Sequence, residues 1–179
     1  MKKSLLIAAL GATLPFAGVA QADYKVTMNA VDIKGVGAPI GTVVVSAAPT
    51  GGVLFTPNLT NLPPGEHGFH VHQFANCGAK AKDGKLEPGA NAGDHYDPKK
   101  THKHAGPAGA GHLGDLPPLK VSAQGTATEP VSAERLALRE LRNKSIVIHV
   151  GGDNLSDQPK PNGGGGARIA CGTIQTGGK

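Results

Sequence analysis

Histidines are the residues of this sequence whose types and spacing could do chemistry. The segment GFHVHQFANC, residues 68–77, places His70 and His72 two positions apart, and Cys77 follows shortly after. On an extended strand, residues i and i+2 point to the same side about 6 to 7 Å apart. Two such imidazoles could bind one metal ion, although an isolated His-x-His pair is more often solvated or part of a core.

The pair is not isolated, because a glycine-rich segment further along the chain supplies more donors. His95, His104 and His112 lie in this segment, and Asp115 follows three residues after the last of them. Three imidazoles and one carboxylate form a closed tetrahedral set suited to zinc. Such an ion would organise a loop that has no hydrophobic core of its own.

His149, in SIVIHV, adds an imidazole from the end of a predicted strand. Together with His70 and His72 it favours copper, because nitrogen-rich tetragonal sites suit Cu(II). Seven donors are then available: His70, His72, His95, His104, His112, His149 and Asp115. Two four-coordinate sites need eight positions, so either one site keeps three ligands or one imidazole uses both ring nitrogens. Counting donors does not choose between these.

The first 22 residues carry the features of a cleavable secretory signal peptide. Lys2 and Lys3 precede an apolar stretch that contains Gly11 and Pro15, and the segment ends in Ala-Gln-Ala. This order indicates export rather than a membrane anchor, and no other apolar run is long enough to span a membrane. Residues 23–179 then suit a single domain with one core.

Cysteine and charge content narrow the function classes. Cys77 and Cys171 are the two cysteines, and in an exported chain they predict one disulfide that fastens the segment after the histidine pair to the C-terminal strand. Of 18 Lys and Arg, two lie in the signal peptide, which leaves 16 against 13 Asp and Glu. This mild excess, with few aromatics, disfavours nucleic-acid binding and fits attraction of a small anion.

Hydrophobic alternation of period two dominates the chain and predicts an all-β fold. Strands are expected over residues 24–33, 41–48, 65–74, 118–131, 144–150 and 168–174, and one short helix over 133–143. Glycine and proline concentrate in two regions, 78–118 and 151–166. Because loops this long inside a compact domain are usually functional or disordered, the histidines in them favour function. The inferred architecture is an antiparallel sandwich or barrel carrying two long loops.

Several motifs occur together in one order: GEHGFHVH, GDHYDP, KHAGPAGAGHLGDLP and HVGGDNLSDQPKPNGGGGARIACG. In these motifs the sequence resembles the copper/zinc superoxide dismutases of the bacterial, exported (periplasmic) type, through essentially the whole of residues 23–179. The resemblance implies an eight-stranded antiparallel Greek-key barrel with two long functional loops. It also implies dismutation of superoxide to dioxygen and hydrogen peroxide, a periplasmic location, and copper and zinc as cofactors.

The resemblance also implies roles for individual residues. Copper would be held by His70, His72, His95 and His149, and zinc by His95, His104, His112 and Asp115. His95 would be the shared imidazole, which would resolve the donor count. Arg168 would guide the anion beside the copper, so that His95 and Arg168 would be the catalytic residues. Asp153 would tie a copper-ligand ring to a zinc-ligand ring, and Cys77 and Cys171 match the family's disulfide.

The remaining features leave alternatives. We expect His67, on the opposite face from His70, to have a structural hydrogen-bonding role, and His102 to be solvated. Lys80, Lys82 and Lys85 either steer the substrate or belong to a solvated loop. A periplasmic copper and zinc carrier or buffer without turnover is the second candidate function, and the chain is expected to be a monomer or a homodimer.

Overall fold

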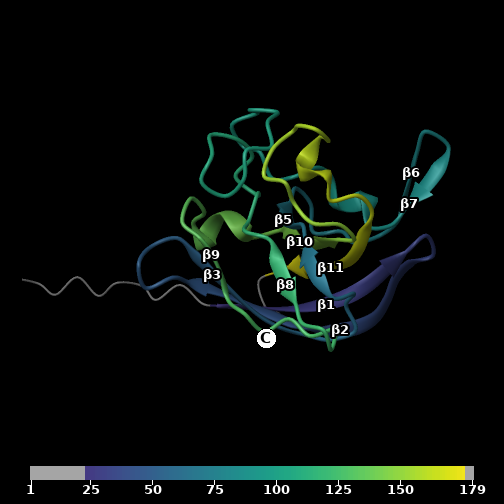
Figure 1. The fold of residues 1–179 in the computed structure, drawn as a ribbon, viewed down its shortest axis with the longest axis horizontal. Helices are drawn as coiled ribbons and strands as arrows, with labels where there is room; N and C mark the ends of the chain where they lie inside the picture. The colour runs from purple at the N-terminus through teal and green to yellow at the C-terminus, as the bar shows by residue number, and fades with distance from the viewer. Residues whose placement is uncertain (1–22, 176–179) are drawn as a thin grey trace, which may run out of the picture.

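Antiparallel strands make up most of the regular structure in the computed structural model, which describes residues 23–175 (Figure 1). The signal peptide expected over residues 1–22 lies outside the described residues. The strands are β1 (Tyr24–Asp32), β2 (Gly35–Ala47), β3 (Val53–Leu59), β4 (Gly65–His67), β5 (Phe69–His72), β6 (Lys80–Lys82), β7 (Lys85–Glu87), β8 (Leu119–Val121), β9 (Val131–Ala133), β10 (Lys144–His149) and β11 (Arg168–Ile174). Three short 3-10 helices accompany them: η1 (Ala90–Ala92), η2 (Leu138–Leu141) and η3 (Asn162–Gly164).

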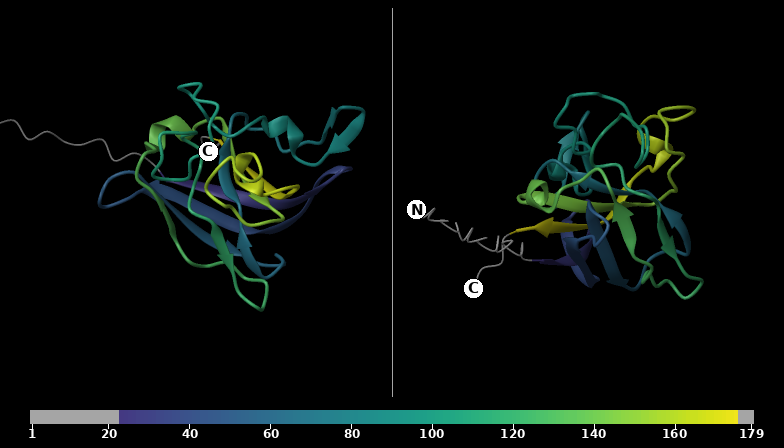
Figure 2. Two further views of the ribbon diagram at one scale, coloured as in Figure 1. Left: turned by 45° about the horizontal axis from the view of Figure 1, so that its top comes forward. Right: turned by 90° about the vertical axis from the view of Figure 1, so that its left-hand side faces the viewer.

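The main sheet has seven strands in the order β5-β10-β11-β1-β2-β3-β9, and β4 pairs with β8 in a second sheet. The sheet curls on itself, as the two further views show (Figure 2). The neighbours β5-β10 and β11-β1 are far apart in the sequence, which is typical of Greek-key connections. Because β4 and β5 are one strand interrupted at Gly68, these sheets hold eight strands. The expected antiparallel Greek-key barrel is therefore confirmed.

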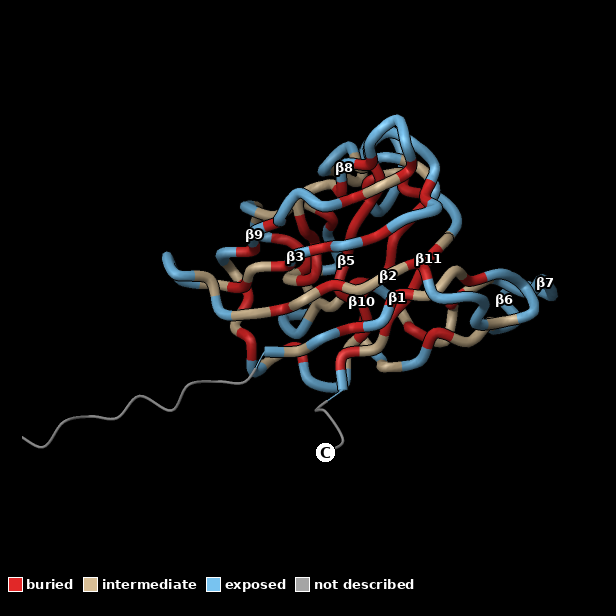
Figure 3. Tube along the Cα trace, turned by 90° about the horizontal axis from the view of Figure 1, so that it is seen from below, coloured by how far each residue is buried: buried red, intermediate tan, exposed pale blue. Residues whose placement is uncertain are grey.

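The core lies inside this curled sheet, where strands such as β3 bury alternate residues (Figure 3). Val43 and Val45 of β2 and Ile146 and Ile148 of β10 are among its fully buried members, as the alternation predicts. Phe55 of β3 packs edge to face on Phe69 of β5, with ring centroids 5.8 Å apart. Such a pair adds stability beyond the burial of its area, and it joins two distant strands of the sheet.

Some predicted elements differ from the structure. The strand expected over 65–74 divides at Gly68, which bonds to the segment around β10: its N–H donates to Gly151 O, and His149 N–H donates to its carbonyl. The strand expected over 118–131 is interrupted by a turn, and β8 and β9 flank that turn. The helix expected over 133–143 was wrong except for η2, because its leucines lack a full helical repeat. β3 was not predicted.

The outer face of β5 and β10 is covered by the two glycine-rich loops rather than by water. Both strands are buried along nearly their whole length. The loop between β7 and β8 carries residues 88–118, and the loop between β10 and β11 carries residues 150–167. Figure 1 shows both loops gathered at one side of the barrel, with the β6–β7 hairpin projecting beside them. Polar side chains on this face are thus enclosed between the sheet and the loops.

Replacing Phe55 by Ala should destabilise the fold, because the cavity left in the core cannot collapse fully. We expect a loss of about 3 to 5 kcal/mol of unfolding free energy, measured by denaturant titration. Thr56→Ala is the matched control, since Thr56 is the exposed neighbour on the same strand, and it should change stability little. Equal stabilities of the two variants would contradict this account of the core.

Candidate metal centre

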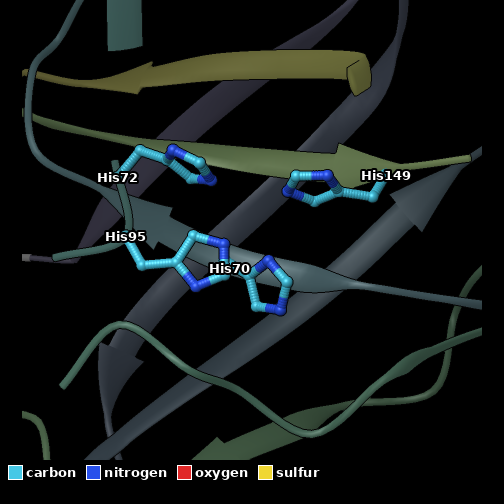
Figure 4. Close-up of side chains that lie close together, drawn as sticks. All are labelled: His70, His72, His95 and His149. Carbon is cyan, nitrogen blue, oxygen red and sulfur yellow. The ribbon is translucent and has the colours of Figure 1, made fainter. Parts of the chain in front are cut away.

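Four histidines converge above β5 and β10, and we call them the His70 group: His70, His72, His95 and His149. His70 and His72 lie on β5 and His149 ends β10, whereas His95 comes from the long loop and pairs with His72 in an isolated bridge. Their rings point toward one common region (Figure 4). Ring centroids are 4.0 Å apart for His70 and His95 and 4.9 Å apart for His70 and His149. The predicted copper ligands are therefore brought together.

A second set, the Asp115 group, contains His95, His104, His112 and Asp115. Oδ1 of Asp115 lies 2.9 Å from Nδ1 of His95, 3.1 Å from Nδ1 of His104 and 3.3 Å from Nδ1 of His112. Four ligand atoms around a tetrahedral zinc at 2.0 to 2.1 Å would stand about 3.3 Å apart. These spacings suit one small ion enclosed by the four residues, as predicted for zinc. His95 belongs to both groups.

Unpaired ring nitrogens test whether metals fit these groups. His72 Nδ1 donates to Gly93 O at 2.9 Å, and His149 Nδ1 donates to Gly166 O at 3.0 Å. Because a carbonyl only accepts, each of these rings carries its proton on Nδ1 and a lone pair on Nε2. Both Nε2 atoms are buried without a hydrogen-bond partner, as are the Nδ1 atoms of His70 and His104. Buried lone pairs without a donor are costly, and a metal ion at each group would satisfy them.

Asp153 links the His70 group to the Asp115 group by accepting hydrogen bonds from the outer ring nitrogens of one histidine in each. Its Oδ2 accepts a hydrogen bond from His70 Nε2 at 2.7 Å, and its Oδ1 accepts one from His104 Nε2 at 2.8 Å. Both rings therefore carry their proton on Nε2 and direct Nδ1 inward. A single carboxylate thus fixes the tautomers of one histidine in each group, which is the geometry expected of Asp153.

Arg168 lies beside the His70 group at the start of β11. Its two terminal nitrogens donate to Gly89 O and Gly93 O, each at 2.6 Å. A cavity of about 260 Å³ is lined by Arg168, His72, His95 and His149. A guanidinium held at the wall of a cavity that also contains ligand-competent imidazoles can bind a small anion there.

The disulfide between Cys77 and Cys171 fastens the segment between β5 and β6 to β11, with the two Cα atoms 5.7 Å apart. That segment contacts the loop that supplies these carbonyls, since Asn91 N–H donates to Gly78 O at 3.0 Å. Since Cys171 lies three residues after Arg168, the bond holds the strand that carries the guanidinium next to this segment. The predicted pairing of the two cysteines is confirmed.

Comparison with known proteins decides the family. The profile of the copper/zinc superoxide dismutases (SODC) matches residues 39–174. This chain belongs to that family. It is 56% identical over 163 residues to "Superoxide dismutase [Cu-Zn] 2" of Salmonella typhimurium, covering 90% of this chain and 94% of the relative.

Solved structures of the family agree with this fold. The Cu/Zn superoxide dismutase from Brucella abortus has a TM-score of 0.84 and 50% identity, covering 86% of this chain and 100% of that one. The monomeric copper, zinc superoxide dismutase from Salmonella enterica has a TM-score of 0.77 and 57% identity, with the same coverage.

Burial sets the protonation states of the His70 group. Loss of solvation lowers the pKa of His70 to about 3, with the neighbouring His95 ring adding to the effect. Burial likewise lowers the pKa of His149 to about 4 and holds that of His72 well below its usual range. All three imidazoles are thus neutral at physiological pH, which is the state that binds a metal ion.

The two carboxylates of the centre, Asp115 and Asp153, are charged, in contrast to these neutral imidazoles. Burial would raise the pKa of Asp115, but the close imidazoles of His104, His112 and His95 outweigh it and hold that pKa well below the usual range. Burial also opposes the shift at Asp153, whose pKa is lowered by hydrogen bonds from His104 and His70. Both groups remain ionised, so the centre carries negative charge that can balance part of the charge of two cations.

The other histidines lie as expected. His67 is buried, with Nδ1 2.7 Å from His149 O and Nε2 2.8 Å from Pro63 O, so it has the predicted structural role. His102 is exposed and belongs to neither metal group. Of the three lysines on the β6–β7 hairpin, Lys82 lines the cavity beside Arg168.

Several residues that shape the centre were missed. Gly89, Gly93 and Gly166 act through backbone carbonyls, which give no side-chain signal. Asp157 accepts a hydrogen bond from His104 N–H at 2.9 Å and so holds the backbone of a histidine in the Asp115 group. The short run of polar residues SDQ, 156–158, was the available signal for Asp157.

Stability of the metal-free protein should fall as the pH drops from about 6.5 to about 4. The folded-state pKa values of His70 and His149 lie below the value of about 6.5 expected in the unfolded chain. The unfolded state therefore binds more protons in this window, which favours unfolding by a few kcal/mol. Denaturant titrations across this range measure the slope, with the metal-loaded protein as control. A flat profile for the metal-free protein would show that these rings are not held neutral.

Proposed function

We propose that this chain catalyses the dismutation of superoxide, in which two superoxide anions and two protons give dioxygen and hydrogen peroxide. In this proposal, the His70 group holds copper and the Asp115 group holds zinc, with His95 shared between them. The observation that carries the proposal is the membership of His95 in both groups, each of which directs buried, unpaired nitrogens inward. Family membership supports the same activity.

Donor chemistry supports the assignment of the two metals. Four imidazoles suit copper, and three imidazoles with one carboxylate suit zinc. Copper, when bound, supplies the one-electron change between Cu(II) and Cu(I), whereas zinc has no redox chemistry and fixes the shared ring and its loop. The residues of the chain supply binding of the substrate and transfer of protons.

His95 and Arg168 take those two roles. Nδ1 of His95 faces Asp115, which leaves Nε2, on the other edge of the ring, for the His70 group. In the proposed cycle Nε2 holds a proton after the first half-reaction and donates it as the second superoxide is reduced to peroxide. Arg168 binds the anion through its charge and orients it in the cavity that these two residues line.

A periplasmic carrier or buffer that binds copper and zinc without turnover is the alternative function. Storage of metal ions requires neither a positively charged side chain at a substrate cavity nor a carboxylate between the two metal groups. The contacts of Asp153 with both groups and the position of Arg168 at the cavity suit those purposes, which supports the enzyme. A catalytically inactive relative is also disfavoured, because all four predicted copper ligands are present.

The proposal includes export and a simple assembly. Residues 1–22 would be removed as a signal peptide, and residues 23–179 would act as one domain in the periplasm, an oxidising compartment that suits the disulfide. Among residues 23–175, no helix is long and apolar enough to cross a membrane. The active form would be a monomer or a homodimer, since one chain supplies both metal groups.

Metal analysis combined with a superoxide-decay assay tests the function. We expect one copper and one zinc per chain, loss of activity on chelation, and recovery on adding both metals but not zinc alone. His72→Ala should abolish activity, whereas His102→Ala, the matched histidine outside both groups, should leave it unchanged. A fully metallated protein that leaves superoxide at its spontaneous rate of decay would refute the enzyme and favour the carrier.

Neutralising Lys80, Lys82 and Lys85 tests whether the β6–β7 hairpin steers superoxide toward the cavity. All three side chains are exposed, and Lys82 reaches the cavity wall. A local positive field raises the encounter rate of a small anion, and salt screens that field. Changing the three lysines to Gln should lower kcat/KM several-fold and flatten its dependence on ionic strength. Lys120→Gln, on β8, is the control, and an unchanged salt profile of the triple variant would assign the hairpin to a solvated loop.

A further inference from the structure

The segment that carries His104 and His112 has little hydrophobic packing to fix it. Residues 105–111 read AGPAGAG, and several of them are exposed or half-buried. The backbone coils tightly: a Cβ added at Gly109 would lie 2.1 Å from Ala105 O, and one at Gly111 would lie 2.3 Å from Lys103 O. Glycine permits this close approach, but its conformational freedom makes the coil costly to order without an anchor.

Arg135 supplies an anchor from outside the segment. It belongs to the connection between β9 and η2 and is partly buried. Its Nη2 donates to His112 O at 2.8 Å and Gly111 O at 3.0 Å, and its Nη1 donates to Gly106 O at 3.4 Å and to Gly109 O. Four carbonyls of one loop thus converge on one guanidinium.

These bonds leave the guanidinium little capacity for another ligand. Arginine has four N–H groups on its terminal nitrogens, and the four carbonyls occupy all of them. Among the ion pairs between described residues, none pairs Arg135 with a carboxylate. A role in binding an anion or a neighbouring acidic residue is therefore disfavoured, and the arrangement instead serves the loop.

We propose that Arg135 is a positioning residue for zinc, acting by holding the backbone of residues 106–112 in the conformation that presents the Asp115 group. The bond to His112 O acts directly on a predicted ligand residue. The effect extends to the backbone of His104 through the neighbouring Lys103, whose carbonyl accepts from His112 N–H at 2.8 Å. This inference rests on the proposed assignment of zinc to the Asp115 group.

Without Arg135, binding of zinc must also order the loop, so the affinity for zinc should fall. Removal of a residue that supports metal ligands typically lowers affinity about 10- to 100-fold, and we expect Arg135→Ala to lie in this range. The segment that Arg135 holds, residues 106–112, contains no member of the His70 group, so copper affinity should fall far less. Arg135→Lys should be intermediate, because an ammonium cannot reach all four carbonyls at once.

The experiment compares zinc and copper affinities of the purified chain by competition with a chromophoric chelator. Cobalt(II) bound in place of zinc adds a spectroscopic readout, since its visible absorption reports tetrahedral geometry at the Asp115 group. Arg139→Ala is the matched control, because Arg139 is an exposed arginine four residues away. The expected result is weaker zinc binding and an altered cobalt spectrum for Arg135→Ala, with the control unchanged.

Two outcomes would overturn the inference. One is a native zinc affinity and cobalt spectrum in Arg135→Ala, and the other is an equal loss of copper and zinc affinity, which would indicate a general effect on folding. Thermal unfolding of the metal-free variants identifies the second case. Failure of the unsubstituted chain to bind zinc at all would instead refute the proposed metal assignment.

Discussion

The structure depends on one constraint: six imidazoles are packed side by side out of water, and each must have a partner for its buried nitrogens. A neutral imidazole offers one donor and one acceptor. Oxygen atoms around the edge of the cluster, from Gly93, Gly166 and Asp153, take the protons of the outer nitrogens. The lone pairs that remain all face inward, where protein donors are absent among the described residues. In the proposed assignment, two cations that share His95 would satisfy these lone pairs and balance part of the charge of the two carboxylates.

That constraint explains why polar contacts, rather than apolar packing, hold the two long loops. The hydrophobic core lies on the other face of the sheet and reaches the first loop only through Leu116, with Tyr96 and Leu113 packed against it. The loops are instead fastened at separate points, by the carbonyls that bind Arg168 and Arg135 and by the bonds that Asp153 and Asp157 accept. Glycines allow these anchors to come close; for example, a Cβ at Gly163 would lie 2.1 Å from Asp153 Oδ1. Metal binding and loop order are therefore linked.

The period-two alternation of hydrophobic residues made the barrel predictable, together with the histidine pair on one of its strands. Alternation marked β1, β10 and β11 to within one or two residues, and it placed His70 and His72 on one side of a strand. β3 was not predicted because Pro57 interrupts its alternating pattern. Pro57 is tolerated in this strand because the pairing of β3 with β9 stops at Phe55. The sharing of His95 could not be derived from donor counts, because it depends on how the loop of residues 88–118 folds over β5 and β10, and it came only from family resemblance. The backbone carbonyls that accept hydrogen bonds could not be predicted from the sequence, since every residue carries one.

The charge on Arg168 shows how this centre stays suited to an anion. Its guanidinium is partly withdrawn from water, and burial lowers its pKa, while Asp94 and Glu87 nearby act in the opposite direction. Its direct partners are the neutral carbonyls of Gly89 and Gly93, so no carboxylate bonded to it cancels its charge. Gly93 O also accepts from His72, which joins the orientation of a predicted ligand to that of the anion-binding group. A carboxylate in place of these carbonyls would fix the side chain equally well but would repel the substrate, so the backbone serves as the better anchor.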